Sequence, residues 1–147
     1  MPHVQRSILV PYLPVRMYEL VRDVERYPQF LPWCAGSRVR PGPEPGTVDA
    51  SIDLAYLGVR SHFVTRNTQR EPGLIRIRLL EGPFRDLEGE WTFAPLGDEA
   101  CKVSLDLRYS FASGVLGRVV APVFDRIAGS LIDAFSRRAE DLYGSGS

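Results

Sequence analysis

Regular alternation of apolar and polar residues is the feature that most constrains how this chain can fold. It runs from Val48 to Phe111, where Gly, Pro and Asp interrupt it at intervals of about a dozen residues. A period of two gives a strand one apolar face and one polar face. Short strands separated by turn residues are typical of an antiparallel meander, so we expect a sheet with one covered face and one wet face.

The cover for the apolar face is predicted in the C-terminal segment. From about Val115 to Tyr143 the apolar residues recur with helical spacing over many turns. Ser113 is the predicted N-cap of this helix, and Pro122 is expected to kink or divide it.

The N-terminal part predicts a strand and a helix. Residues 3–10 alternate like a strand that Pro11 ends, and a helix with one apolar stripe follows from Pro14 until Pro28 stops it. Together these elements predict an α+β fold: a curved antiparallel sheet of about seven strands wrapped around a long C-terminal helix. We assign residues 1–143 to this single domain and residues 144–147 to a flexible tail.

The segment from Tyr27 to Cys34 is unusual because it is both proline-rich and apolar. Proline limits it to a short or irregular conformation, and its apolar side chains are unusual for a solvent loop. We therefore expect it to act as a lid over a cleft between the sheet and the long helix. Such clefts are mostly apolar when they hold a ligand.

Composition narrows the function. The chain has 147 residues, 44% of them hydrophobic, with 18 acidic and 18 basic side chains. A neutral chain of this length is expected to be one globular domain, and its charge argues against DNA binding. No apolar leader or membrane-length apolar run occurs, which favours a cytoplasmic location. The two cysteines, Cys34 and Cys101, are expected to be reduced structural thiols.

Catalytic and metal chemistry find little support. The two histidines, His3 and His62, are far apart in sequence from each other and from the cysteines, and we expect His62 to face solvent on a strand. The carboxylates of the polar sheet face are expected to pair across strands with Arg76, Arg78 and Arg108. We predict no catalytic residue, no metal and no cofactor.

Several segments resemble a known family when they are read together. They are Ser7–Tyr12, Met17–Cys34, Glu81–Phe93 and the terminal stretch Phe124–Ala139, which occur in the order that the family shows. On these segments the chain resembles the coenzyme Q-binding START-like proteins of the polyketide cyclase/START superfamily, which include the bacterial ribosome-association toxins. The resemblance implies a helix-grip fold, as in START and Bet v 1 proteins, with a hydrophobic tunnel between helix and sheet.

The resemblance implies three alternative functions. The first is binding of ubiquinone or a related polyprenyl lipid as a carrier that supports respiration, with transient contact with the inner membrane. The second is association with the large ribosomal subunit, which blocks subunit joining. The third is a polyketide cyclase or aromatase activity. We favour the first, because the Pro32–Trp33 pair resembles the quinone-binding branch, and we read the charged sheet face as ordinary solvated surface.

The expected ligand is then an apolar molecule held between the terminal helix and the sheet. The predicted wall consists of large apolar and aromatic residues on the covered faces: Trp33, Phe63, Leu79, Phe84, Trp91, Tyr109, Phe111, Val120, Phe124, Ile127 and Leu131.

Overall fold

Among the described residues, seven strands form one antiparallel sheet, and two α-helices, a 3₁₀ helix and a π-helical turn complete the fold. A computed structural model describes residues 3–70, 73–112 and 114–144, without the side chain of Leu116. The elements in chain order are β1 (His3–Val10), α1 (Pro14–Arg22), the 3₁₀ helix η1 (Val24–Gln29), β2 (Cys34–Pro41), β3 (Thr47–Tyr56), β4 (Val59–Arg70), β5 (Leu74–Glu81), β6 (Phe84–Leu96), β7 (Ala100–Phe111), α2 (Val115–Ala139) and the π-helical turn η2 (Glu140–Gly144).

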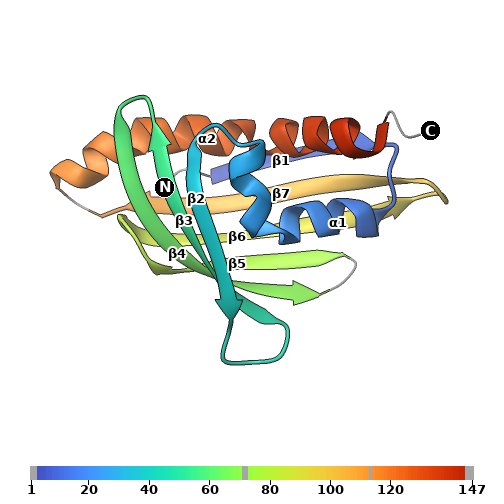
Figure 1. The fold of residues 1–147 in the computed structure, drawn as a ribbon, viewed down its shortest axis with the longest axis horizontal. Helices are drawn as coiled ribbons and strands as arrows, with labels where there is room; N and C mark the ends of the chain where they lie inside the picture. The colour runs from blue at the N-terminus through green and yellow to red at the C-terminus, as the bar shows by residue number, and fades with distance from the viewer. Residues whose placement is uncertain (1–2, 71–72, 113, 145–147) are drawn as a thin grey trace.

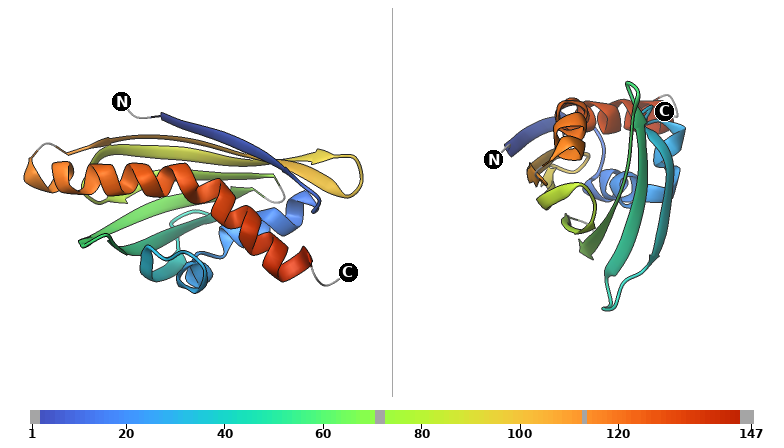
Figure 2. Two further views of the ribbon diagram at one scale, coloured as in Figure 1. Left: turned by 90° about the horizontal axis from the view of Figure 1, so that it is seen from above. Right: turned by 90° about the vertical axis from the view of Figure 1, so that its left-hand side faces the viewer.

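The sheet order is β1-β7-β6-β5-β4-β3-β2, so the first strand pairs with the last and β2 forms the other edge. The sheet curves strongly, and α2 lies along its concave side (Figure 1; Figure 2). Helix α1 and η1 lie on the same side, near the C-terminal half of α2 (Figure 2). The predicted α+β helix-grip fold is therefore confirmed.

The alternation in sequence becomes alternation in burial. In β7 the odd-numbered residues from Cys101 to Tyr109 are buried, whereas Lys102 and Arg108 on the other parity are exposed. The buried residues of the strands face α1, η1 and α2 and form one hydrophobic core with them.

Helix α1 is shorter than predicted. It ends at Arg22, because Asp23 leaves the helical conformation with ψ 66°. The chain then continues as η1, which contains Pro28. The prediction that Pro28 stops one longer helix was wrong: α1 ends at Arg22, and the 3₁₀ helix begins at Val24, four residues before Pro28.

Helix α2 is one continuous helix of 25 residues, so Pro122 does not divide it. Its axis bends part-way along its length (Figure 2). Residues on both sides of the proline, including Val120 and Phe124, are buried against the sheet, and this packing offsets the hydrogen bond that proline cannot donate. The predicted N-cap Ser113 lies outside the described residues. Of the predicted tail, Gly144 ends η2 and residues 145–147 lie outside the described residues.

No helix among the described residues combines the length and the apolar character that a membrane crossing requires.

Candidate functional site

Aromatic rings fill the space between the first half of α2 and the sheet. Phe124 of α2 contacts four rings on the inner face of the sheet, with centroid distances of 4.8 to 6.2 Å. These rings belong to Phe63, Phe84, Tyr109 and Phe111. All four contacts with Phe124 are edge-to-face, a favourable geometry for aromatic pairs. We call these five residues the Phe124 cluster.

The predicted ligand wall coincides largely with this interior. Eight of its residues are buried, namely Trp33, Phe63, Phe84, Trp91, Tyr109, Val120, Phe124 and Ile127. Leu79, Phe111 and Leu131 are half-buried and pack against the same core. The structure thus brings five of the eleven into the Phe124 cluster, and it places Trp91 farther along α2. No ring contact joins Trp33 to the cluster within the described part of the chain.

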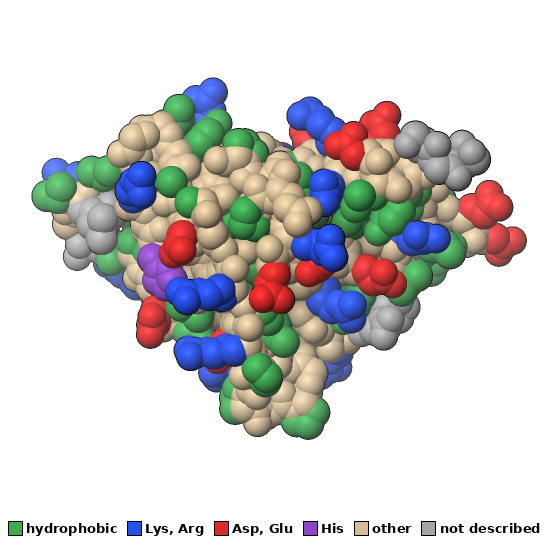
Figure 3. All heavy atoms as spheres, viewed as in Figure 1, with side chains coloured by type: hydrophobic (Ala, Val, Ile, Leu, Met, Phe, Trp, Pro, Cys, Tyr) green, Lys and Arg blue, Asp and Glu red, His purple; other side chains and the backbone are tan. Residues whose placement is uncertain are grey.

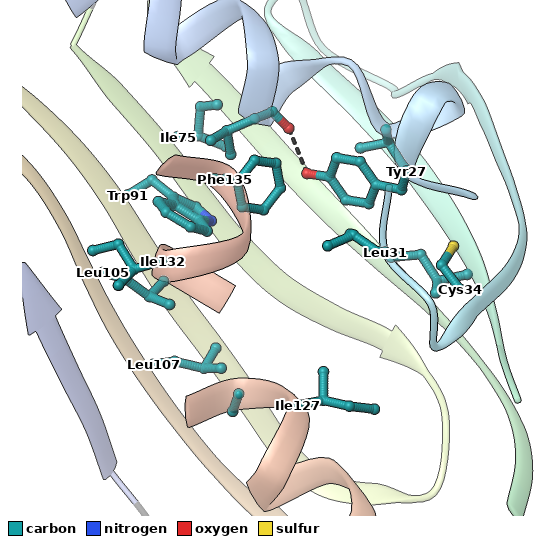
Figure 4. Packing of buried hydrophobic residues seen from close by; sticks show 14 of the residues in the cluster. Tyr27, Leu31, Cys34, Ile75, Trp91, Leu105, Leu107, Ile127, Ile132 and Phe135 are labelled. Carbon is teal, nitrogen blue, oxygen red and sulfur yellow. Dashed lines mark hydrogen bonds between the residues drawn. The ribbon is translucent and has the colours of Figure 1, made fainter. Parts of the chain in front are cut away.

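A second cluster surrounds Phe135, three helical turns farther along α2. The rings of Tyr27, Phe30 and Trp91 contact Phe135 at centroid distances of 5.2 to 5.4 Å. Figure 4 shows Phe135 between Trp91 and Tyr27, and the hydroxyl of Tyr27 donates a hydrogen bond to the backbone carbonyl of Val21. Burial raises the pKa of Tyr27 above its ordinary value. The proline-rich segment thus closes this end of the core.

Two buried hydroxyl groups in the interior donate hydrogen bonds to nearby side chains. The Tyr109 hydroxyl donates to a carboxylate oxygen of Asp125 on α2 at 2.6 Å, and burial together with that carboxylate raises the pKa of Tyr109. On β4, Thr65 donates to Asn67 at 2.8 Å, and both are buried. Cys34 and Cys101 are buried thiols whose pKa is raised by desolvation.

The outer face of the sheet carries a row of charged side chains across all seven strands, which we call the outer charge row. Each member stands directly opposite the next on the neighbouring strand. From β2 to β1 the row consists of Arg40, Asp49, Arg66, Arg78, Glu88, Arg108 and His3.

A surface hollow of about 910 Å³ lies over this face. Six cations line it (Arg6, Arg66, Arg76, Arg78, Lys102 and Arg108), together with the four carboxylates of Glu44, Glu88, Glu90 and Asp106. Acidic and basic side chains are likewise interspersed on the molecular face seen in Figure 3. None of the eleven residues of the predicted wall lines this hollow.

Cross-strand ion pairs neutralise part of this surface. Arg66 makes two hydrogen bonds to Asp49, at 2.9 and 3.2 Å, and these hold the pKa of Asp49 below its ordinary value. Arg76 pairs with Glu90 at 3.2 Å. The prediction of cross-strand pairing is confirmed for Arg76.

The expected partners of the other two arginines differ. Arg108 approaches Asp106 of its own strand at 3.9 Å, whereas Arg78 makes no ion pair within 4 Å of any described residue. Arg78 and Arg108 both stand opposite Glu88 in register, without a close ion pair to it among the described residues.

A smaller hollow of about 230 Å³ lies where α1, η1 and the end of α2 meet. Arg138 borders it, stacks on Phe30 at 4.9 Å from the ring centroid, and donates to the Gln29 side chain at 3.0 Å. Its Nε is buried without a hydrogen-bond partner among the described residues. This hollow also contains none of the predicted wall residues.

The two histidines lie on the outer face beside carboxylates. His62 is exposed, as predicted, and its Nδ1 is 2.6 Å from Asp53, while His3 Nε2 is 2.6 Å from Asp106. The hydrogen bond from His3 holds the pKa of Asp106 below its ordinary value. No group of three or more His, Cys, Asp or Glu suited to a metal ion occurs within the described ranges.

Comparison with known proteins identifies the family. The family model described as polyketide cyclase / dehydrase and lipid transport matches residues 10–136. The chain belongs to this family. Proteins that share one fold can serve a range of functions, so membership settles the fold and leaves the partner open.

Two named relatives illustrate this range. The chain is 40% identical over 142 residues to the ribosome association toxin RatA of Pseudomonas aeruginosa, covering 97% of this chain and 98% of the relative. It is 26% identical over 133 residues to the mitochondrial coenzyme Q-binding protein COQ10 homolog B of Xenopus laevis, covering 88% of this chain and 54% of the relative.

Two solved structures share the fold of this chain. The protein CC1736 of Caulobacter crescentus is 37% identical, with a TM-score of 0.75 and coverage of 99% of this chain and 100% of that chain. The ZhuI aromatase/cyclase of Streptomyces sp. R1128 has a TM-score of 0.84 at 16% identity, with coverage of 99% and 98%. The second likeness concerns the fold alone.

Sequence reasoning missed three features of these surfaces. It did not find the partner of the Tyr109 hydroxyl, the alignment of the outer charge row, or the hollow beside Arg138. The one sequence signal for the partner of Tyr109 is that Asp125 directly follows Phe124, a residue predicted to lie in the same ligand wall as Tyr109. The charge row depends on strand register, which alternation alone does not reveal.

Proposed function

We propose that this chain associates with the ribosome, binds its large subunit and limits subunit joining. The observation that carries the proposal is the 40% identity to the ribosome association toxin RatA across nearly the whole of both chains. The relative named for coenzyme Q binding is less similar and is matched over only 54% of its length. The chain would act in the cytoplasm.

The surface chemistry is compatible with this proposal. The six cations that line the larger hollow outnumber its four carboxylates, although the whole chain has a formal net charge of zero. Ribosomes expose RNA, and RNA phosphates attract such local positive charge. The function favoured by the sequence analysis, that of a lipid carrier, therefore becomes the second candidate function.

Sedimentation tests the proposed association. The purified chain is mixed with large subunits, small subunits or both, and each mixture is separated on a sucrose gradient. We expect the chain to sediment with large subunits and to reduce the peak of joined ribosomes when both subunits are present. A chain that remains at the top of every gradient contradicts the proposal.

Binding of an apolar molecule, such as ubiquinone or another polyprenyl lipid, is the second candidate. It is favoured by the large apolar residues, predicted as a wall, that line the interface between α2 and the sheet. Because the rings of the Phe124 cluster already contact one another, a ligand would have to separate them. Transient contact with a membrane would be needed to load it.

Lipid extraction tests this candidate. Protein purified under native conditions from a quinone-producing host is extracted and analysed by mass spectrometry, beside protein from a quinone-deficient host. The candidate requires a quinone or polyprenyl lipid at near-stoichiometric amounts in the first sample. Trace amounts equal in both samples exclude it. Neither candidate assigns catalysis to the chain.

A further inference from the structure

The outer charge row contains an electrostatic conflict. Arg66 on β4 and Arg78 on β5 stand directly opposite each other. Like charges at such positions destabilise a sheet. Asp49 neutralises Arg66 through two hydrogen bonds, but Arg78 is exposed and has no ion pair within 4 Å among the described residues. Arg78 therefore remains available to an external anion.

Two further cations on β7 share this availability. Lys102 is exposed and makes no ion pair with any residue that the structure describes, and Arg108 is exposed with a long contact to Asp106 at 3.9 Å. Both line the same hollow as Arg78. Besides Arg6 on the edge strand β1, the hollow thus presents three weakly partnered cations on two strands separated by β6.

The spacing of the three cations indicates what they can bind. Strands β5 and β7 are two steps apart, or about 10 Å, because neighbouring strands are about 4.8 Å apart. Lys102 and Arg108 are six residues apart on one strand, or about 20 Å. A single phosphate or another small anion cannot bridge such distances, whereas a polyanion with regularly repeated charges can contact all three.

We propose that the outer face of the sheet binds the phosphate backbone of large-subunit ribosomal RNA through Arg78, Lys102 and Arg108. The choice of RNA rests on the proposed ribosome association. Two of the four carboxylates of the hollow already have partners, since Glu90 pairs with Arg76 at 3.2 Å and Asp106 lies 2.6 Å from His3. Phosphate contacts position a protein on RNA without reading its sequence.

The test measures binding to deproteinised large-subunit ribosomal RNA at increasing KCl concentration. Three phosphate contacts give a slope of log affinity against log salt of about −2 for single strands, or nearly −3 for duplex. Raising salt from about 50 to 200 mM should therefore weaken wild-type binding about 20- to 40-fold.

The matched variants each lose three positive charges. Arg78→Gln/Lys102→Gln/Arg108→Gln changes the outer face, and Arg118→Gln/Arg126→Gln/Arg137→Gln changes exposed positions on α2, across the sheet from the row. We expect the first variant to lose most of the salt dependence and to bind RNA at least tenfold more weakly at low salt. The α2 variant should retain the wild-type slope.

The outcomes separate this inference from the proposed function. If the wild-type chain sediments with large subunits and the outer-face variant does so equally well, the outer face is not the binding surface while ribosome association stands. Salt-insensitive binding to subunits without binding to free RNA would assign the contact to a ribosomal protein and overturn the inference. If the wild-type chain binds neither subunits nor RNA, both proposals fail.

Discussion

One buried hydroxyl forms a hydrogen bond between the sheet and α2. Tyr109 is 1% exposed, and its hydroxyl donates to Asp125 at 2.6 Å, so the bond links β7 to the helix that covers it. The carboxylate remains accessible to water, because Asp125 is exposed. Loss of the hydroxyl therefore leaves no buried charge without a partner.

The first prediction concerns this hydrogen bond. Tyr109→Phe should lower the free energy of unfolding by about 1.5 kcal/mol, the lower end of the range for a hydrogen bond to a charged group, because the Asp125 carboxylate stays accessible to water. Urea denaturation measures it. Tyr56→Phe is the control, because Tyr56 is half-buried and its hydroxyl has no hydrogen bond among the described residues. Equal losses in the two variants would show that the Tyr109 bond contributes nothing specific.

The second prediction concerns pH. Because the hydrogen bonds from Arg66 lower the pKa of Asp49 in the folded state, its contribution to stability is complete above the ordinary aspartate pKa of about 4. That contribution is lost as the pH falls through the lower folded pKa. Asp49→Asn should therefore show a shallower loss of thermal stability below pH 4 than the wild-type chain.

Asp98→Asn is the control for this measurement. Asp98 is exposed in the turn between β6 and β7 and has no ion pair within the described ranges. Its acid unfolding curve should follow that of the wild-type chain. An Asp49→Asn curve parallel to the wild-type curve would contradict the prediction.

The third prediction concerns a glycine in the turn before β6. Gly82 has φ 151°, and a Cβ there would lie 2.7 Å from Cβ of Phe63. Gly82→Ala should destabilise the chain by about 1–3 kcal/mol through backbone strain and this contact. Gly58 has φ 79° but open space around it, so Gly58→Ala measures backbone strain alone. A smaller loss of stability for Gly82→Ala than for Gly58→Ala would contradict the predicted effect of this contact.

At the scale of elements, α2 is anchored at two points on one face. Phe124 and Phe135 are 11 residues apart, which is about 16 Å along the helix and close to three whole turns. Phe124 contacts rings from β4, β6 and β7, whereas Phe135 contacts Trp91 of β6 and two rings of the proline-rich segment. The second anchor therefore joins three parts of the fold.

The fourth prediction compares these anchors. Phe135→Ala should cost about 3–5 kcal/mol, because the ring is fully buried among three others. If the Phe124 cluster can open for an apolar ligand, Phe124→Ala should cost less than Phe135→Ala and should raise binding of a hydrophobic fluorescent probe. Equal costs with no change in probe binding would argue for a solid core at both anchors.

The strands and their buried faces could be predicted because a period of two determines them directly. Leu105, Leu107 and Tyr109 were placed on the covered face by position alone, and they are buried there. The end of α1 could not be predicted, since neither proline nor glycine stands at Asp23, where the backbone leaves the helical conformation. Tertiary contacts override local propensity at such places.

The candidate sites were less predictable than the fold. That the large inner-face residues are buried followed from the pattern, but which rings touch Phe124 depends on register and on the bend of α2. The outer charge row depends on register as well: Arg78 and Glu88 are opposite only because of the length of the β5–β6 turn. A one-residue slip would move such residues to the other face.

For the whole molecule, the two candidate functions use opposite faces of one sheet. The apolar interior lies under α2, and the hollow with the unpaired cations lies on the outer side. The strands connect the two faces, but their side chains point in opposite directions. Changes to the outer cations can therefore be made without altering the core, which makes the two functions separable by experiment.

The order of the strands also determines when the sheet can be completed and covered during synthesis. Ile8 of β1 pairs with Val103 of β7, and α2 follows only after β7 is complete. At about 5–20 residues per second, synthesis from the end of β2 to the end of α2 takes about 5 to 20 seconds. Until α2 has emerged, the apolar residues of these strands lack the helix against which they pack in the folded core, so the core can close only after that point.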